Sequence, residues 1–406
     1  KYLIIYYYNK RENNLRTKNM SFCIYDSDIV VCNNDHLIIY NIDNNLINTI
    51  ALPQLECNKV VNIHNNVDIE SYHMIISTTF SNDGKYFLVC TNRKQLCLYE
   101  RKSKRLISNR ILSRAASKVI FSPNNDIIVA DKAGDAYLFS TANPIENGTL
   151  LLGHLSMLLD ILVTEDGKYI LTTDRDEKIR VSMFPHSYNI VSYCLGHSKF
   201  VTNICELPHK KKILISSGGD GTFMLWNYEY GRELLTINFS EKIAKYNIDK
   251  FNQILKTNHY EEYVNVLPVK HLKAMALDKL SSLLVISFYS SNILLIYIID
   301  ETVESQLTAT WIETIIMEDE PLDCFLKNHR MWVLTNSGVN IYILKNNHFV
   351  LDSITNNILK ELNEVWMSLN NNTLTQNLFP ILYKRKYDNV QQYLERKKSR
   401  LSNTLE

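Results

Sequence analysis

Acidic side chains are the first residues of this sequence that could do chemistry. Asp174, Asp176 and Glu177 lie close together, and two neighbouring carboxylates can act as general acid and general base. Arg175 and Lys178 alternate with them, and the segments on either side are patterned as β-strands. This arrangement favours a charged turn between two strands over a paired-carboxylate catalytic site.

Histidines and glycines are the other candidates for a reactive site. His154 and His197 each follow a glycine at the start of a repeated pattern, so we interpret them as hydrogen-bonded structural residues. The glycine cluster at 217–221 leads into a strand, which makes it a hairpin turn rather than a phosphate cradle. The motifs G-x-x-x-x-G-K-[ST], H-E-x-x-H and G-x-S-x-G do not occur in the sequence. We therefore expect no catalytic residue and no bound cofactor on this chain.

Composition narrows the classes of protein and of binding partner that remain possible. The 406 residues carry a net charge of only +1 and are 46% hydrophobic, which predicts a large core and no broad electrostatic grip on nucleic acid. The eight cysteines form no C-x-x-C pair, which indicates a reducing compartment and no metal site. The uncharged stretch 280–299 has the length of a membrane span, but polar residues at 287–292 divide it. We predict two buried strands joined by a turn, and no membrane partner.

Internal repeats predict the elements that position these side chains. The segment 196–228 contains Gly-His, a strand, a turn, a second strand, Ser-Ser-x-x-Asp-Gly-Thr and a third strand that ends at Trp226. The segment 153–182 has the same layout, and weaker copies end at residues 40, 99, 139, 297 and 342. Most of the intervals match the roughly 40–45 residues of a propeller blade. The sequence therefore predicts an all-β fold, a seven-bladed WD-repeat β-propeller whose closure removes exposed sheet edges.

The domain boundaries follow from this count. The propeller is expected at 20–354, with insertions near 42–71 and 241–268 and with the strand 348–354 completing the last blade against N-terminal strands. Residues 1–19 form a leader that we assign to no blade. Residues 355–406 are expected to form a helical, basic tail. Apolar residues with helical spacing occur there in two sets, which are Ile358, Leu362, Val365 and Leu369, and Tyr383, Tyr387, Val390 and Leu394.

The repeated polar residues have a structural interpretation. In the clearest blade we expect His197, Ser216, Asp220 and Trp226 to share a buried hydrogen-bond network, in which the aspartate holds the turn and the indole N–H finds an acceptor. His154 is the corresponding histidine of the preceding blade. Such a network is a strong indication of the fold and does not indicate an activity.

Charged surface segments are the remaining functional candidates. The run 174–180 places six charges in seven residues, and a mixed-sign cluster suits a partner with complementary charges. Two basic runs near the C-terminus have three open interpretations, which are contact with RNA phosphates, a nuclear import signal, or a solvated surface. These runs comprise Lys384, Arg385, Lys386, Arg396, Lys397 and Lys398.

Six segments resemble a known family. They are LLGHLSMLLD (151–160), DRDEKIRVS (174–182), CLGH (194–197), SSGGDGT (216–222), VADKAGDAY (129–137) and LYKRKYDNVQQYLERKKSRL (382–401). Together they resemble the WD-repeat non-catalytic subunit of the eukaryotic tRNA (guanine-N7)-methyltransferase. The resemblance covers most of 20–406, whereas residues 1–19 and the insertion at 241–268 have no counterpart that we can place.

The resemblance implies a scaffold that binds a separate S-adenosylmethionine-dependent catalytic subunit as a heterodimer. Together the two subunits would methylate N7 of a guanosine in the tRNA variable loop, with the methyl donor on the partner and the complex in the nucleus or also in the cytoplasm. The resemblance places Arg175, Asp176, Glu177, Lys178 and Arg180 at the subunit interface, with Arg180 pairing with acidic groups of the partner. It also places the basic tail near the tRNA.

One departure and two alternatives accompany this interpretation. Ser182 and Met183 stand where the family has aromatic character, which leaves the support of the Arg180 side chain open. A WD-repeat adaptor or substrate receptor of a ubiquitin ligase is the main alternative, and tRNA methylation would not depend on such a protein. A propeller hydrolase would need convergent carboxylates or metal ligands in the central channel.

Overall fold

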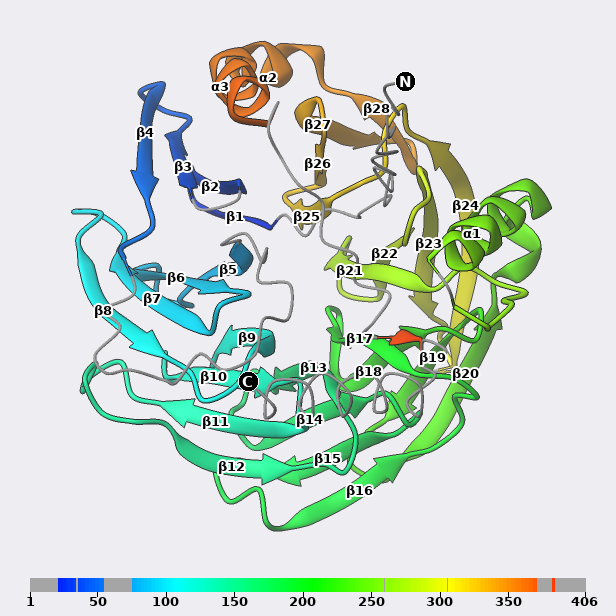
Figure 1. Cartoon of the computed structure of the whole chain (residues 1–406). Coiled ribbons are helices and arrows are strands. Elements are labelled where there is room, and N and C mark those ends of the chain that lie inside the picture. The colour runs from blue at the N-terminus through cyan, green and yellow to red at the C-terminus, as the bar shows by residue number, and fades with distance from the viewer. Residues whose placement is uncertain are drawn as a thin grey trace, which may run out of the picture.

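The structure, a computed structural model, is a ring of seven four-stranded antiparallel sheets around a central channel (Figure 1). It describes residues 21–33, 36–54, 75–258, 260–304, 306–370 and 382–383. Each sheet is built from four strands that are consecutive in the chain. The prediction of a seven-bladed β-propeller is therefore confirmed. Residues 1–19, the predicted leader, lie outside the described residues.

The strands have the following bounds. The first three sheets contain β1 (Phe22–Tyr25), β2 (Asp28–Asn33), β3 (His36–Asn41) and β4 (Leu46–Ala51); β5 (Ile75–Phe80), β6 (Tyr86–Thr91), β7 (Gln95–Glu100) and β8 (Leu106–Ile111); and β9 (Ala116–Phe121), β10 (Ile127–Asp131), β11 (Asp135–Phe139) and β12 (Thr149–Gly153). The fourth and fifth contain β13 (Leu158–Val163), β14 (Tyr169–Asp174), β15 (Ile179–Met183) and β16 (Ile190–Cys194); and β17 (Val201–Leu207), β18 (Lys210–Gly218), β19 (Thr222–Asn227) and β20 (Arg232–Asn238). The last two contain β21 (Val269–Ala276), β22 (Ser281–Phe288), β23 (Ile293–Glu301) and β24 (Leu307–Ile316); and β25 (Asp323–Lys327), β26 (Arg330–Thr335), β27 (Gly338–Lys345) and β28 (His348–Leu351).

The sequence repeats coincide with one strand of every sheet. The seven predicted end positions, from residue 40 to residue 342, all lie in third strands, which are β3, β7, β11, β15, β19, β23 and β27. The first hairpins of the second and fourth sheets show why the repeats recur. In each, an aspartate accepts hydrogen bonds from the turn and a glycine follows at positive φ, as in Asp83–Gly84 and Asp166–Gly167. Glycine adopts this backbone conformation at no steric cost.

The core lies between neighbouring sheets, because both faces of most inner strands are covered. Leu37 of β3 and Phe87 of β6, for example, belong to one buried cluster between the first and second sheets. The uncharged stretch 280–299 forms β22 and β23 of the sixth sheet, and every residue of β22 is buried. The predicted strand-turn-strand is confirmed. In the described part of the chain, no helix is both long and apolar enough to cross a membrane.

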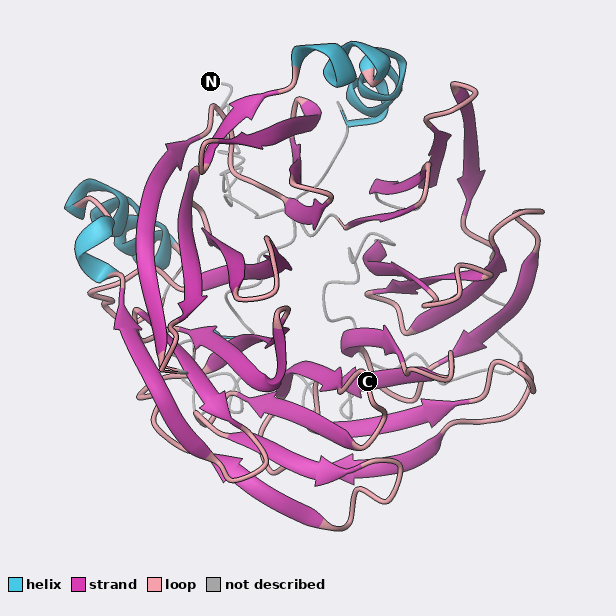
Figure 2. Cartoon of the chain, turned by 180° about the vertical axis from the view of Figure 1, so that it is seen from behind, coloured by secondary structure: helices cyan, strands magenta, loops and turns pink. Residues whose placement is uncertain are grey.

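The helices lie on the outside of the ring (Figure 2). The short 3-10 helix η1 (Ser240–Lys242) and α1 (Lys245–Thr257) occupy the predicted insertion between β20 and β21. The strand β4 occupies part of the other predicted insertion, so the extra residues of that interval lie after Ala51. The helices α2 (Ser353–Ile358) and α3 (Lys360–Asn370) follow the last sheet and confirm the predicted helical start of the C-terminal part. The second predicted helix and both basic runs lie outside the described residues, apart from Leu382 and Tyr383.

Closure of the ring differs from the prediction. The strand β28 does complete the last sheet, but it pairs with β27 and not with N-terminal strands. The first and last sheets therefore share no strand. They meet instead through a hydrogen bond from the Phe22 backbone N–H to Asp323 Oδ2 (3.2 Å), through the approach of β1 to β25, and through the apolar face of α3.

The helix α3 covers the seam between the first and last sheets. Its Leu362 and Trp366 are buried in one cluster with Ile38 and Tyr40 of β3 and with Trp332 of β26. The Trp366 indole N–H lies within hydrogen-bond distance of two backbone carbonyl oxygens, those of residues 335 (3.2 Å) and 336 (3.1 Å). The Tyr40 hydroxyl donates to the carbonyl of residue 358 (2.8 Å). The two helices thus hold both ends of the propeller together.

Candidate protein-partner interface

The fifth sheet contains the predicted buried network. The Trp226 indole N–H donates to Ser216 Oγ (2.7 Å), and Ser216 Oγ lies 2.7 Å from His197 Nε2. His197 Nδ1 lies 2.7 Å from Asp220 Oδ2. Because a carboxylate only accepts, the Nδ1–H donates to Asp220 and Nε2 accepts from the serine hydroxyl. The chain of hydrogen bonds ties the loop before β17 to the turn between β18 and β19.

The fourth sheet has the same histidine–aspartate pair without the tryptophan. His154 Nδ1 lies 2.9 Å from Asp174 Oδ2, and its Nε2 lies 2.8 Å from Thr172 Oγ1. Ser182 occupies the tryptophan position and accepts a hydrogen bond from Arg180 Nε (2.9 Å). A guanidinium therefore stands where the fifth sheet has an indole.

The Arg180 side chain forms hydrogen bonds within its own chain. Besides Ser182, its guanidinium donates to the carbonyl oxygens of Gly153 (3.2 Å) and Ser187 (2.8 Å). These contacts fix the hairpin between β15 and β16 and the end of β12. Partial burial lowers the pKa of Arg180, which still remains charged at neutral pH. The expected pairing of Arg180 with acidic groups of a partner stays a prediction, and the side chain also has a structural role.

The charged turn separates its carboxylates. Asp174 is buried and accepts from the backbone N–H groups of Asp176 (2.9 Å) and Lys178 (3.3 Å), so it shapes the turn. Asp176, Glu177 and Lys178 are exposed to solvent, and Arg175 is half-buried. A buried structural aspartate and two solvated acids do not form an acid–base pair.

Two exposed leucines flank this turn, and sequence reasoning missed them. Leu155 is fully exposed, and Leu195 is 63% exposed. The Met157 carbonyl accepts from Arg175 N–H (3.1 Å) on one side, and Ile179 pairs with Cys194 on the other, so both leucines lie at the same end of the sheet as the turn. One sequence signal was available, since residue 155 after Gly-His is leucine whereas residue 198 in the next repeat is serine.

We call this surface the blade-four rim and define it by Leu155, Asp176, Glu177, Lys178 and Leu195. Exposed apolar side chains next to charges of both signs are typical of a protein-binding surface, in which apolar contacts supply affinity and charges set orientation. The histidine–aspartate bonds beneath it hold the loops in place, so little conformational entropy remains to be lost when a partner binds.

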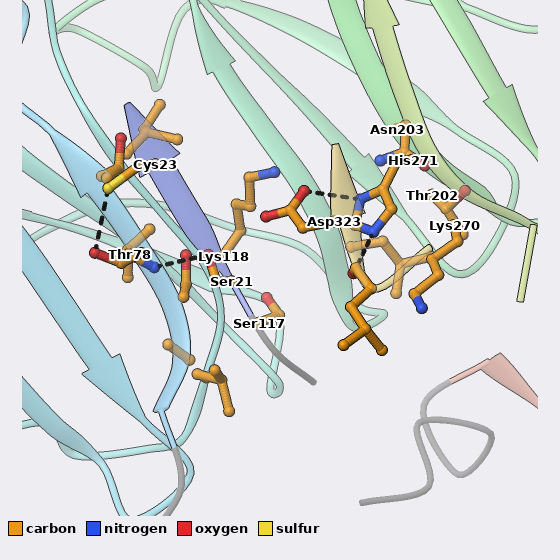
Figure 3. A pocket seen from close by; sticks show the side chains of 18 of the residues that line it. Ser21, Cys23, Thr78, Ser117, Lys118, Thr202, Asn203, Lys270, His271 and Asp323 are labelled. Atoms are coloured by element: carbon orange, nitrogen blue, oxygen red, sulfur yellow. Dashed lines mark hydrogen bonds and ion pairs between the residues drawn. The ribbon is translucent and has the colours of Figure 1, made fainter. Parts of the chain in front are cut away.

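A hydrolase site would lie in the central channel. The channel contains a cavity of about 330 Å³ lined by first strands of the sheets (Figure 3). The acid that lines it is Asp323, whose Oδ1 lies 3.7 Å from His271 Nδ1. The lining lysines Lys118 and Lys270 face Asp160 (3.1 Å) and Glu320 (2.8 Å). Burial lowers the pKa of His271 to about 4, which keeps it neutral. Among the described residues, no group of three or more His, Cys, Asp or Glu side chains is placed to hold a metal ion. Among the described residues the cavity lining contains this one histidine–aspartate pair and no paired carboxylates.

The fifth-sheet network makes stability depend on pH. Burial alone would raise the pKa of Asp220, but the hydrogen bonds that it accepts from His197, from Thr222 and from the backbone of Ser198 hold it below the usual value. A carboxylate with a lowered pKa stabilises the fold above its unfolded pKa of about 4, and this contribution is lost as pH falls through the folded pKa. We expect Asp220→Asn to lose about 1–3 kcal/mol at pH 7 and to show a flatter decline in acid.

Urea unfolding at pH 7 and at several acidic pH values measures this effect. Asp176→Asn is the matched control, because Asp176 occupies the corresponding turn of the fourth sheet and is exposed. Equal pH dependence in wild type and Asp220→Asn would show that the network contributes nothing to acid sensitivity.

The fold defines the class of protein, a WD-repeat β-propeller, and the blade-four rim suits contact with a partner. A family model described as the tRNA methyltransferase TRM82 WD40 domain matches residues 139–337. The tRNA (guanine-N(7)-)-methyltransferase non-catalytic subunit wdr4 of Xenopus laevis is 34% identical over 342 residues, which is 80% of each chain. The Danio rerio wdr4 subunit is 32% identical over 80% of this chain and 77% of its own length. The Homo sapiens subunit WDR4 is 45% identical over 161 residues, 39% of each chain.

Among solved structures, a chain from one titled "Crystal Structure of Mitotic Checkpoint Complex" matches with a TM-score of 0.59. The match covers 84% of this chain and 94% of that chain at 13% sequence identity, so it shows the fold alone. The sequence relatives, in contrast, identify the family. The chain belongs to the family of non-catalytic subunits of tRNA (guanine-N(7)-)-methyltransferase. The family assignment confirms the prediction that this chain is not itself an enzyme, and it implies a catalytic partner.

Proposed function

We propose that this chain forms a heterodimer with a separate catalytic subunit and supports N7-methylation of a guanosine in the tRNA variable loop. The observation that carries the proposal is the 34% identity to a curated non-catalytic subunit over 80% of both chains. A rigid ring with a patterned rim suits a scaffold, because it presents a preformed surface whose contacts favour the active conformation of a bound enzyme. The methyl donor, S-adenosylmethionine, belongs on the partner in this proposal.

The blade-four rim is the surface that we assign to the catalytic subunit. Leu155 and Leu195 supply apolar area for the centre of the interface, and their burial would contribute about 1.5–3 kcal/mol each. Asp176, Glu177 and Lys178 set orientation through complementary charges, and their exposure makes this contribution sensitive to salt. Arg175 and Arg180 belong to the same proposed interface, where the Arg175 backbone N–H donates to the Met157 carbonyl and the Arg180 guanidinium holds the hairpin between β15 and β16.

The C-terminal basic runs are the proposed contact with tRNA. Lysine and arginine neutralise phosphates and release counterions, which raises affinity without reading sequence. The tail supplies local positive charge in a chain whose net charge, tail included, is only +1. A nuclear location fits the same basic runs, which also suit an import signal.

Reconstitution tests the proposal. We expect the catalytic subunit with S-adenosylmethionine and tRNA to form little N7-methylguanosine alone and at least tenfold more when this chain is added. This chain alone should bind no methyl donor and show no turnover. The readout is N7-methylguanosine by mass spectrometry of digested tRNA. An unchanged yield with and without this chain would reject the scaffold role.

A further inference from the structure

The cavity in the central channel is not used by the proposed interface, and we call it the axial cavity. Its volume of about 330 Å³ lies within the roughly 300–1,000 Å³ of small-molecule sites. Residues from the first strand of every sheet line it, which places it on the axis of the ring (Figure 3). Phe22, Leu159 and Tyr289 contribute apolar surface to the wall, and polar side chains contribute much of the rest. Such a mixed lining suits a ligand with both a polar and an apolar part.

Lysines dominate the charged part of this wall. The described lining contains one acid, Asp323, and four lysines, which are Lys118, Lys132, Lys270 and Lys273. The ion pairs described above neutralise Lys118 and Lys270. Burial alone would lower the pKa of Lys273, but charge attraction, mainly from Asp323, raises it above the usual value. Asp323 and Lys273 therefore balance each other, and Lys132 is left over.

Lys132 is the lysine whose charge is not balanced. In the part of the chain that the structure describes, no acid lies at ion-pair distance from it. Its side chain is half-buried, and burial lowers its pKa. A partly desolvated ammonium without a counter-charge is stabilised by a nearby anion. The charge balance of the axial cavity therefore favours an anionic ligand.

The backbone of Lys132 is fixed by a hydrogen bond that recurs in the sheets. Its N–H, in the turn between β10 and β11, donates to the Ala115 carbonyl (3.0 Å). The N–H of Tyr289, in the turn between β22 and β23, donates in the same way to the Pro268 carbonyl (3.1 Å). Both turn residues line the axial cavity, so the cation and the aromatic ring are presented from the same kind of rigid turn. Little backbone entropy remains to be lost when a ligand binds between them.

Asn203 adds an acceptor that lacks a donor. It lines the axial cavity from β17 (Figure 3). Its Oδ1 atom is buried and has no hydrogen-bond partner among the described residues. A buried acceptor of this kind costs free energy until a hydroxyl or an N–H group reaches it. A ligand that brings a hydroxyl group would supply the missing donor.

We propose that the axial cavity binds a small phosphate monoester with hydroxyl groups, either a sugar phosphate or a nucleoside monophosphate. The phosphate lies against Lys132, a hydroxyl donates to Asn203 Oδ1, and the apolar lining covers the rest of the ligand. Phosphate suits this wall because each lysine ammonium has three donors, so Lys118 and Lys270 keep donors beyond those of their ion pairs. The inference does not depend on the proposed role in tRNA methylation.

Calorimetric titration of the full chain tests the site. The probes are ribose phosphate and adenosine monophosphate, and ribose and adenosine are the unphosphorylated controls. We expect at least one probe to bind at least tenfold more tightly than its control, and the tighter probe identifies which of the two sources fits the site. Binding of neither probe to the wild-type chain would overturn the proposal.

Lys132→Met removes the charge and keeps the length of the side chain. We expect it to weaken binding of the phosphorylated probe at least tenfold, because a charge-assisted hydrogen bond is lost, and to leave thermal stability undiminished. Lys168→Met is the matched control, since Lys168 is 67% exposed in the hairpin between β13 and β14, at the other end of the strands. Equal affinity in wild type and Lys132→Met would overturn the phosphate site.

Asn203→Leu separates recognition of the hydroxyl from recognition of the phosphate. We expect it to weaken binding of the phosphorylated probe about fivefold and to leave the affinity for inorganic phosphate unchanged. Inorganic phosphate that binds wild type as tightly as both probes would overturn the hydroxyl contact. This comparison uses the wild-type chain alone, so it decides the point even if Asn203→Leu does not fold.

Discussion

Replacing Trp366 by alanine is expected to destabilise the whole propeller by about 3–5 kcal/mol. The side chain is 1% exposed and fills the seam between the first and last sheets. Its loss leaves a cavity at the point where the two sheets share no strand, and it leaves the carbonyls of residues 335 and 336 without their indole donor. Because Trp366 packs against both the first and the last sheet, its loss weakens the packing of both sheets.

Thermal and urea unfolding measure this effect, and Trp311→Ala is the matched control. Trp311 is 40% exposed on β24, where it faces Lys242 Nζ at 4.5 Å from the ring centroid. We expect its loss to cost about 0.5–1 kcal/mol. If the two tryptophan variants unfold alike, α3 does not hold the ring closed.

Replacing Leu155 by aspartate is expected to weaken binding of the catalytic subunit about 30-fold or more. Leu155 is fully exposed in the free chain, so the change should leave stability within about 0.5 kcal/mol. In the complex it would force a carboxylate into the apolar centre of the interface, and central contacts of this kind are worth about 2 kcal/mol or more. Since each 1.4 kcal/mol is tenfold in affinity, the loss is easy to detect.

Titration of the two purified subunits measures this loss, with Ile145→Asp as the control. Ile145 is 93% exposed in the hairpin between β11 and β12, at the opposite end of the strands from the blade-four rim. Equal affinity of both variants would remove the rim from the interface. Lys178→Glu should act differently, because an exposed charge affects mainly the association rate and its salt dependence.

Arg180→Glu is a poorer test than its sequence position suggests. The Arg180 guanidinium donates to Ser182 and to two backbone carbonyls of its own chain, at Gly153 and Ser187. A carboxylate there would face these acceptors without a donor, so the variant would disturb the fourth sheet itself. A loss of partner binding in Arg180→Glu would therefore combine a local folding defect with any loss of contact.

The sequence allowed the blades and their polar networks to be predicted because both are local. Strand spacing, turn residues and the histidine–aspartate–tryptophan positions recur within about 43 residues, and each depends on neighbours in the same or the next sheet. The network of His197, Ser216, Asp220 and Trp226 is an example, since all four side chains come from one repeat. Local patterns of this kind can be recognised in a sequence without knowledge of distant contacts.

Contacts between distant segments could not be predicted in the same way. The helical spacing of residues 358–369 indicated a helix but not the seam that α3 covers, because periodicity does not identify the opposing surface. The ring of Tyr383 packs beside the rings of Phe200, Phe251 and Tyr260, and no local sequence pattern links these four residues. The exposure of Leu155 likewise depends on the loop that carries it, since a leucine in a β-rich sequence is usually buried.

A ring that exchanges no strand between its ends has a consequence for biosynthesis. The first sheet takes no strand from the far end of the chain, so its four strands can pair while the ribosome is still making the other blades. The nascent protein then adds one sheet at a time, and the helices α2 and α3 are translated only after the seventh sheet. Covering of the seam by α3 is thus the last event on this route, and a stop codon before α3 would leave exposed the apolar residues of the first and last sheets that Leu362 and Trp366 cover, a natural substrate for chaperones.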